Sequence, residues 1–542
     1  MTKSYAAVAA SADESSRTPS FRDLSGREAA ILAAILIATI AVYLPSLRNG
    51  WVFDDTSQIV KSLPLHNWTG IGKSFIYDSW WFLAPNHLPQ SAYYRPLQAS
   101  WFGLNFMIFG NHPAAWHLEK IVLQLIGVVL CFRVAQLLTR SSAIALLTAG
   151  IFALLPANTE SVVWVSAIGE PLSTAFELGA LCCLINRKPG LSRGLVFALL
   201  LYAGALLTHE TAILFSAIVA AYVFLFEAGE ERPARRVVAA VRTCVPFVVL
   251  AAIYMGARLN ALGVDFLFGV PQTITSGVVR GMVEARAHHS LVETLMTLPM
   301  VLLAYPAVLA VPWLADPTHP IDWITRPQPV VFLAWAAVVL LMATMSLAAW
   351  RSSHRRIYLF CAVWSVITIA PALNLNALWY LVDDRYLYAP SFGWSLAVAT
   401  AAMQIVASGS SARRTVGVAI AFILVASVVS IARTERYWYD DVAFFQRCVQ
   451  IKPSDPGYRI RLAEAMNIAG DKNGAALALE RGTELNPDDA YMRLKLAQQY
   501  QMMGRDMDFE REFQKFNELS AASAMRNQAA QNSDASPAAG AP

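Results

Sequence analysis

Two aspartates, Asp54 and Asp55, follow the first apolar segment of the chain and could supply a general base. The apolar segment covers residues 29–47, which is long enough to cross a membrane when its flanks are included. An acidic pair beside hydrocarbon is costly, so its presence indicates a functional role. A positioned carboxylate can take the proton of an attacking hydroxyl group. The pair therefore predicts acid–base chemistry at a membrane surface.

Further charged and aromatic side chains occur in the polar segments between apolar runs. Arginine binds phosphate through two parallel hydrogen bonds, and Trp and Tyr rings pack against sugars near the membrane interface. No GxxxxGK[ST] or strand-linked GxGxxG motif offers a site for a nucleotide donor. These residue types fit the transfer of a sugar from a lipid phosphate to a hydroxyl. The candidates are Arg95, Glu160, Trp164, Glu210, Arg258, Arg385 and Tyr386.

The composition indicates a membrane protein that is all-α. Of the 542 residues, 56% are hydrophobic and 15% are charged, against about 25% charged residues in an ordinary soluble domain. The mean hydropathy is +0.44. The net charge of +4 is small and its basic residues are scattered, which argues against nucleic-acid binding.

Apolar runs of roughly 20 residues predict about eleven membrane spans within residues 29–433. One further segment, 291–313, contains Pro299, Pro306 and Pro312 and is interpreted as a re-entrant or interfacial hairpin. The predicted spans are 29–47, 116–138, 141–157, 170–186, 194–208, 211–227, 237–256, 329–350, 356–372, 388–407 and 414–432.

Basic residues predict the orientation of these spans. Arginines and lysines precede the first span and recur in alternate connections, as at Arg140, Arg187, Arg351 and Arg413. Such residues favour the cytoplasmic side, so the N-terminal tail, 1–28, is predicted to be cytoplasmic. The long loop 49–113 and the C-terminal region then lie outside. This is the periplasm in a bacterium or the lumen in a eukaryote, and a bacterial inner membrane is the predicted location.

The C-terminal region carries a short internal repeat. Pro453 and Pro487 lie 34 residues apart, as do Gly470 and Gly504. This period is typical of tetratricopeptide repeats, whose stacked helix pairs bind peptides. The repeat region is predicted to cover 434–520, with helices at 456–469, 472–485, 489–503 and 506–519. The Ala-, Ser- and Pro-rich stretch 521–542 is predicted to be disordered.

Several short motifs together resemble a known family. The set resembles the transmembrane and tetratricopeptide-repeat O-mannosyltransferases and their bacterial relatives, of the GT-C class of polyprenyl-phosphate-sugar glycosyltransferases. The similarity extends from the first span to the repeats. The motifs are Phe53-Asp54-Asp55, Tyr94-Arg95-Pro96-Leu97, Trp116-His117-Leu118, Glu160-Ser161-Val162-Val163-Trp164-Val165-Ser166, His209-Glu210-Thr211-Ala212-Ile213 and Arg385-Tyr386-Leu387-Tyr388-Ala389-Pro390-Ser391.

The resemblance implies an inverting sugar transfer on the outer face, to a protein or glycan acceptor that the repeats would help to dock. It implies that Asp54 or Asp55 accepts the proton of the acceptor. The other predicted roles are acceptor or sugar binding by Glu160, Glu210, His117 and Trp164, and donor-phosphate binding by Arg385, Tyr386, Arg95 and Arg258. No cofactor or metal is expected, although a divalent ion at the aspartate pair is an alternative.

Three departures from the family pattern leave the sugar and the acceptor open. Asn158 and Thr159 stand where a histidine is usual, His209 stands in place of lysine, and Asp384 stands in place of glutamate. Two other functions also stay open. One is an oligosaccharide polymerase or ligase that uses a polyprenyl-diphosphate donor, and the other is a non-catalytic membrane anchor for the repeats.

Overall fold

The computed structural model describes residues 24–83, 91–187, 192–227, 232–264, 290–373 and 381–534. All regular structure in these ranges is helical, as predicted. The chain divides into two compact units, Met1–Asp316 with Ile321–Arg436, and Pro317–Pro320 with Tyr437–Pro542. Most of the predicted N-terminal tail lies outside the described residues.

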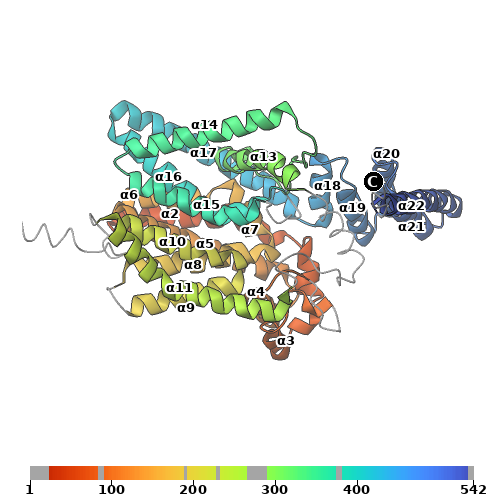
Figure 1. Cartoon of the computed structure of the whole chain (residues 1–542), viewed down its shortest axis with the longest axis horizontal. Helices are drawn as coiled ribbons and strands as arrows, with labels where there is room; N and C mark the ends of the chain where they lie inside the picture. Colours follow the sequence, from red (N-terminus) through yellow and green to blue (C-terminus); the bar gives the residue numbers. More distant parts are fainter. Residues whose placement is uncertain are drawn as a thin grey trace, which may run out of the picture. The chain divides into compact units, whose positions relative to one another are not determined.

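The first unit is a bundle of long apolar helices. Ten helical segments among the described residues are long and apolar enough to cross a membrane, which confirms a multi-pass membrane protein. Figure 1 shows them lying roughly alongside one another. Their main helices are α2 (Gly26–Tyr43), α5 (Pro113–Thr139), α8 (Gly169–Ile185), α10 (Phe215–Tyr222), α11 (Pro233–Leu262), α13 (Leu291–Ala310), α14 (Pro329–Arg351), α15 (Arg355–Ile369), α16 (Tyr388–Ala407) and α17 (Ser410–Glu435).

Two predicted spans differ from a plain crossing. The segment predicted at 141–157 is broken into α6 (Ser142–Ala153) and Pro156–Val163, which meet at 55°. Pro156 explains the break, because proline restricts the residue before it and cannot donate a helical hydrogen bond. The second piece includes the short helix α7 (Thr159–Val163). The second is the segment predicted at 194–208. It forms helix α9 (Arg193–Thr208), which has only 16 residues and is shorter than the candidate spans.

The prediction of a hairpin at 291–313 is wrong. The structure has one continuous helix, α13, which runs through Pro299 and Pro306. The Thr297 hydroxyl accepts a hydrogen bond from Ile324 N at 3.0 Å, and Tyr305 donates to the Ala372 carbonyl at 3.4 Å. Pro299 leaves the Leu295 carbonyl, four residues earlier, without its helical donor. Trp335 Nε1 of α14 donates to that carbonyl at 3.3 Å, so a neighbouring helix makes the proline tolerable.

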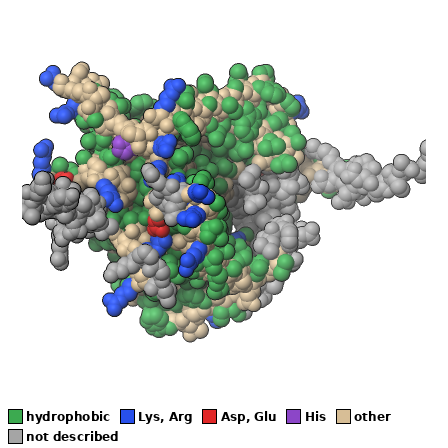
Figure 2. All heavy atoms as spheres, turned by 60° about the vertical axis from the view of Figure 1, so that its left-hand side comes forward, with side chains coloured by type: hydrophobic (Ala, Val, Ile, Leu, Met, Phe, Trp, Pro, Cys, Tyr) green, Lys and Arg blue, Asp and Glu red, His purple; other side chains and the backbone are tan. Residues whose placement is uncertain are grey.

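The first loop is compact and packs on the bundle. It contains η3 (Thr56–Val60), η4 (Leu63–Leu65), α3 (Trp68–Lys73), η5 (Trp81–Leu83) and α4 (Pro96–Phe109). Ile59 and Phe102 of this loop share an apolar cluster with Trp116 of α5 and Leu172 of α8. Figure 2 brings forward the end of the bundle opposite α3, where Lys and Arg side chains gather beside hydrophobic flanks.

The second unit is a series of antiparallel helices. Gly470 and Gly504 follow the first helix of each pair with φ of +87° and +70°, a conformation that favours glycine. The predicted helices agree closely, but α22 continues to Asp534, where disorder was predicted from residue 521. Alanine-rich sequence has high helix propensity. The helices are α18 (Asp441–Ile451), α19 (Pro456–Ile468), α20 (Lys472–Leu485), α21 (Ala490–Met502) and α22 (Asp506–Asp534).

Candidate active site

Asp55 fastens the start of the first loop to the segment after α7. Its Oδ2 accepts a hydrogen bond from Val52 N at 3.1 Å, and its Oδ1 accepts from Ser166 N and Oγ at 2.7 and 2.6 Å. Trp164 Nε1 donates to the Val52 carbonyl at 3.2 Å. Phe53, which lies between Val52 and Asp55 in the chain, has a φ of +57°. This backbone conformation costs energy for a residue with a side chain of this size. The hydrogen bonds therefore hold a strained turn in place.

The two aspartates of this turn have different surroundings. Asp55 is 1% exposed, and burial raises its pKa to about 7 although the hydrogen bonds from Ser166 oppose the shift. Asp54 is half-buried, and its Oδ2 accepts a hydrogen bond from Gln58 Nε2 at 3.4 Å. Both oxygens of Asp55 are thus occupied by protein donors, whereas solvent reaches Asp54.

A divalent ion at the aspartate pair would need further ligands. Within the part of the chain that the structure describes, no group of three or more His, Cys, Asp or Glu side chains could hold an ion. The oxygens of Asp55 already accept three hydrogen bonds from the protein. This arrangement fits an anchoring carboxylate.

Arg385 lies at the centre of a cluster of carboxylates. Its guanidinium nitrogens lie 2.8 Å from Asp383 Oδ2, 3.9 Å from Glu160 Oε1 and 4.0 Å from Glu170 Oε1. Glu160 Oε2 also accepts a hydrogen bond from Arg385 N at 3.2 Å. The side chains of Arg385 and Asp383 are only 16% and 4% exposed. Because charges buried this far are strongly destabilising once a partner is lost, each member depends on the others.

Two aromatic rings enclose the Arg385 guanidinium. Its central carbon lies 4.9 Å from the Trp164 ring centroid and 5.1 Å from that of Tyr386. Such contacts with the ring faces are attractive. Because Trp164 also donates to Val52, it connects the arginine cluster directly to the aspartate turn.

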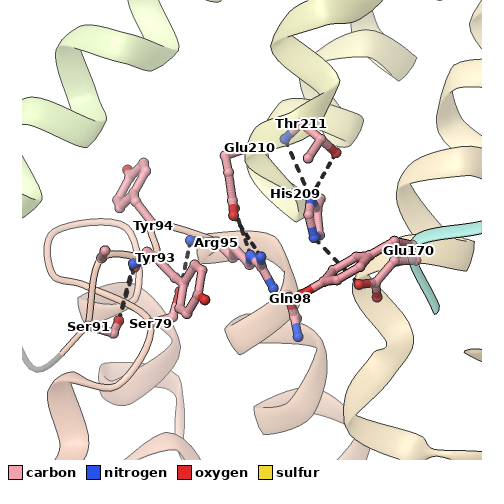
Figure 3. Close-up of polar contacts among 12 residues, drawn as sticks. Ser79, Ser91, Tyr93, Tyr94, Arg95, Gln98, Glu170, His209, Glu210 and Thr211 are labelled. Carbon is pink, nitrogen blue, oxygen red and sulfur yellow. Dashed lines mark hydrogen bonds and ion pairs between the residues drawn. The ribbon is translucent and has the colours of Figure 1, made fainter. Parts of the chain in front are cut away.

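A second buried ion pair joins Arg95 and Glu210 (Figure 3). Arg95 Nε and NH2 each donate to one oxygen of Glu210 at 2.7 Å, a bidentate arrangement. The Tyr93 ring lies 4.5 Å from the guanidinium. Arg95 stands at the start of α4 and Glu210 at the start of η8 (Glu210–Leu214), so the pair ties the first loop to a later segment.

His209 and Glu170 lie beside the pair of Arg95 and Glu210 (Figure 3). His209 Nε2 is 3.7 Å from Glu170 Oε1, and its Nδ1 is 2.9 Å from Thr211 Oγ1. Burial lowers the pKa of His209. Glu170 therefore faces both His209 and Arg385, and it links the two clusters into one polar network.

Arg258 approaches the first loop from α11. Its NH2 donates to the Ala92 carbonyl at 3.1 Å. One helical turn earlier, Tyr254 Oη donates to the Tyr94 carbonyl at 2.9 Å. These two side chains hold the backbone segment that leads into Arg95.

The structure brings together all of the predicted site residues except His117. That residue is 1% exposed on α5, and its Nε2 lies 3.4 Å from the Gly50 carbonyl beneath the first loop. A ring buried in this way does not line the surface of the site. His117 therefore contacts the backbone at the start of the first loop, and its contact with acceptor or sugar stays a prediction.

Two important residues escaped the sequence analysis. Glu170 is an acidic residue within an apolar run, which is a signal of function in membrane helices. Ser166 ends one of the family-like motifs but received no role, because its partner Asp55 lies 111 residues away in the chain.

Known proteins similar to this chain were found by sequence and by structure. No protein-family model matches. Mouse protein O-mannosyl-transferase TMTC3 is 22% identical over 515 residues, covering 90% of this chain and 54% of that protein. Drosophila melanogaster protein O-mannosyl-transferase Tmtc3 is 24% identical over 539 residues, covering 88% and 58%. The homologues of this chain are TMTC-type O-mannosyl-transferases.

The homology agrees with the family resemblance of the motifs. The chain spans a little over half the length of these curated relatives. Among solved structures, the oligosaccharyltransferase of Archaeoglobus fulgidus, tethered with an acceptor peptide containing the NVT sequon, matches with a TM-score of 0.42. It is 11% identical and the match covers 80% of this chain and 58% of that one.

Proposed function

We propose that the chain is a GT-C membrane glycosyltransferase that moves a sugar from a polyprenyl-phosphate donor to an acceptor hydroxyl, with inversion. The observation that carries the proposal is the direct linkage of the aspartate turn to the Arg385 cluster through Trp164. One site thus offers both a base for the acceptor and cations for a phosphate. The homology to O-mannosyl-transferases supports the same reaction class.

Asp54 is the proposed base. The acceptor hydroxyl gives its proton to the Asp54 carboxylate while its oxygen bonds to the anomeric carbon of the sugar. The bond from that carbon to the phosphate oxygen breaks, and the electron pair leaves with the polyprenyl phosphate. Asp55 holds the turn that presents Asp54, since its own oxygens accept hydrogen bonds from Val52 and Ser166.

Arg95, Arg258 and Arg385 are the proposed cations for the donor phosphate, with Tyr386 beside Arg385. Glu160 and Glu210 contact Arg385 and Arg95, so we assign them the role of holding these arginines rather than binding sugar directly. The Trp164 ring is proposed to pack against the sugar or to act through its contact with the Arg385 guanidinium.

The proposed orientation has a cytoplasmic N-terminus and a site on the periplasmic face of a bacterial inner membrane. The collection of basic side chains at the end opposite α3 supports it (Figure 2). The helical pairs of the second unit are the proposed tetratricopeptide repeats, and docking of an acceptor protein or glycan is their proposed role.

The test uses the purified full chain in lipid nanodiscs, supplied with polyprenyl-phosphate mannose and, in parallel, with other hexose or pentose forms. Mass spectrometry would measure the release of polyprenyl phosphate and the mass added to acceptor proteins. We expect release by the wild type and by Lys61→Gln, an exposed control in the same loop. The Asp54→Asn variant should not release it.

Three results would contradict the proposal. Unchanged release by Asp54→Asn would remove the base assignment. Transfer only from an oligosaccharide diphosphate would favour a ligase. Loss of cellular function on deleting 437–542, with the loop carboxylates dispensable, would favour a scaffold.

A further inference from the structure

Lys120 is an unusual residue for the middle of an apolar helix. It lies in α5, its side chain is 1% exposed, and its Nζ has no hydrogen-bond partner among the described residues. A buried charge without direct partners costs several kcal/mol. Ionisable residues inside membrane segments mark functional sites for this reason.

The position of Lys120 on α5 directs it toward the site. Trp116, Lys120 and Leu123 follow the spacing of one helix face. Trp116 and Leu123 pack in one apolar cluster with Ile59 of the first loop and Val165 of the segment after α7. The face that carries Lys120 is therefore covered by these same two segments.

Those two segments meet at the hydrogen bonds between Asp55 and Ser166. Asp55 lies four residues before Ile59, and Ser166 directly follows Val165. Lys120 is thus buried beside the junction that fastens the aspartate turn, and no other lysine or arginine occurs between residues 113 and 132.

The charged groups that face Lys120 come from three elements. They are Asp55 of the first loop, Glu170 of α8, and Glu119 and His117 of α5 itself. Glu119 accepts hydrogen bonds from two side chains of α4 at 2.9 and 3.2 Å. Across the bundle from α5, the carboxylates near Lys120 are Asp55 and Glu170.

We propose that Lys120 is a positioning residue whose ammonium is an internal counter-charge that favours the ionised form of Asp55 and so helps to fasten the aspartate turn to Ser166. An ionised carboxylate accepts all three of the observed hydrogen bonds, whereas a protonated one gives up acceptor capacity. The consequence for catalysis, presentation of Asp54, rests on the proposed function. The role of Lys120 as a counter-charge does not rest on the proposed function.

Infrared spectroscopy of the full chain in nanodiscs tests the counter-charge without any substrate. The carbonyl stretch of protonated Asp55 is assigned by its loss in Asp55→Asn, and its intensity is followed against pH. Lys120→Met removes the charge at similar volume, so the midpoint should rise by about one pH unit or more. Lys61→Met removes an exposed charge in the first loop and should leave the midpoint in place.

A wild-type midpoint in Lys120→Met would overturn the proposal, whether or not transfer is observed. If Lys120→Met does not fold, Lys120→Gln keeps a polar group without the charge and should give the same upward shift. A shifted midpoint in a protein that transfers no sugar would support the counter-charge and contradict the proposed function instead. In an active protein, the acid limb of the pH–rate profile should move upward with the infrared midpoint.

Discussion

Two ion pairs, one from each unit of the chain, have very different surroundings. In the first unit, the pair of Arg385 and Asp383 has side chains that are 16% and 4% exposed. In the second unit, Arg481 and Glu484 form a pair at 2.6 Å in which both side chains are 61% exposed. The distances are similar, but only the first pair has been removed from water.

This difference indicates that the buried pair serves chemistry, whereas the exposed pair serves solubility. An exposed pair contributes about 0–1 kcal/mol, so its loss changes little. A buried pair is costly to assemble, and apolar residues of similar volume would often serve stability equally well. Its presence at the site therefore argues for a function that needs the charges themselves.

The largest effect is expected on removing Arg385. Arg385→Ala leaves Asp383, Glu160 and Glu170 close together without their shared cation. We expect a loss of about 3–5 kcal/mol in stability, seen as a lower midpoint of thermal unfolding, together with loss of transfer. A variant with wild-type unfolding would show that the cluster is not electrostatically coupled.

The next effect separates the two aspartates. Asp54→Asn should lower the rate of transfer by about 10²–10⁴-fold while lowering the unfolding midpoint less than Asp55→Asn does, because Asp54 is half-buried and Asp55 is fully buried. Asp55→Asn should lower both, because it disturbs the contacts to Ser166. Parallel measurements of rate and unfolding check this. The reverse pattern would make Asp55 the base.

Sequence periodicity predicted the helical fold well, and it did so for a physical reason. Membrane spans are set by length and apolar content, and the 34-residue repeat is set by glycines that need positive φ. The form of α13 was missed, because three prolines suggest a break, whereas Trp335 of a neighbouring helix donates to the Leu295 carbonyl that Pro299 leaves without a helical donor.

The site was predictable in its charged residues but not in their pairing. Asp54, Arg95, Glu210 and Arg385 could be identified because charges beside membrane spans are expensive. That Glu210 holds Arg95 could not be predicted, since the two are 115 residues apart and pairing depends on how the helices pack.

A smaller effect is the share of the pH dependence of stability that Asp55 contributes. Its pKa in the folded protein is raised from 3.8 to about 7 by burial. Between these values the folded state binds more protons than the unfolded state, so stability should fall as pH rises from about 4 to 7. Asp55→Asn should remove this part of the pH dependence. Unfolding midpoints of both proteins across the range measure it, and parallel curves would contradict the assignment.

The smallest effect is expected in the second unit. Arg481→Ala should change stability by less than about 0.5 kcal/mol and leave transfer unchanged, because both partners are exposed. The matched comparison is Glu512→Gln in the same unit, where Glu512 is 4% exposed and lies 2.8 Å from Arg493. This change should lower the unfolding midpoint more than Arg481→Ala does. Equal shifts for the two variants would mean that burial does not decide the contribution of an ion pair in this protein.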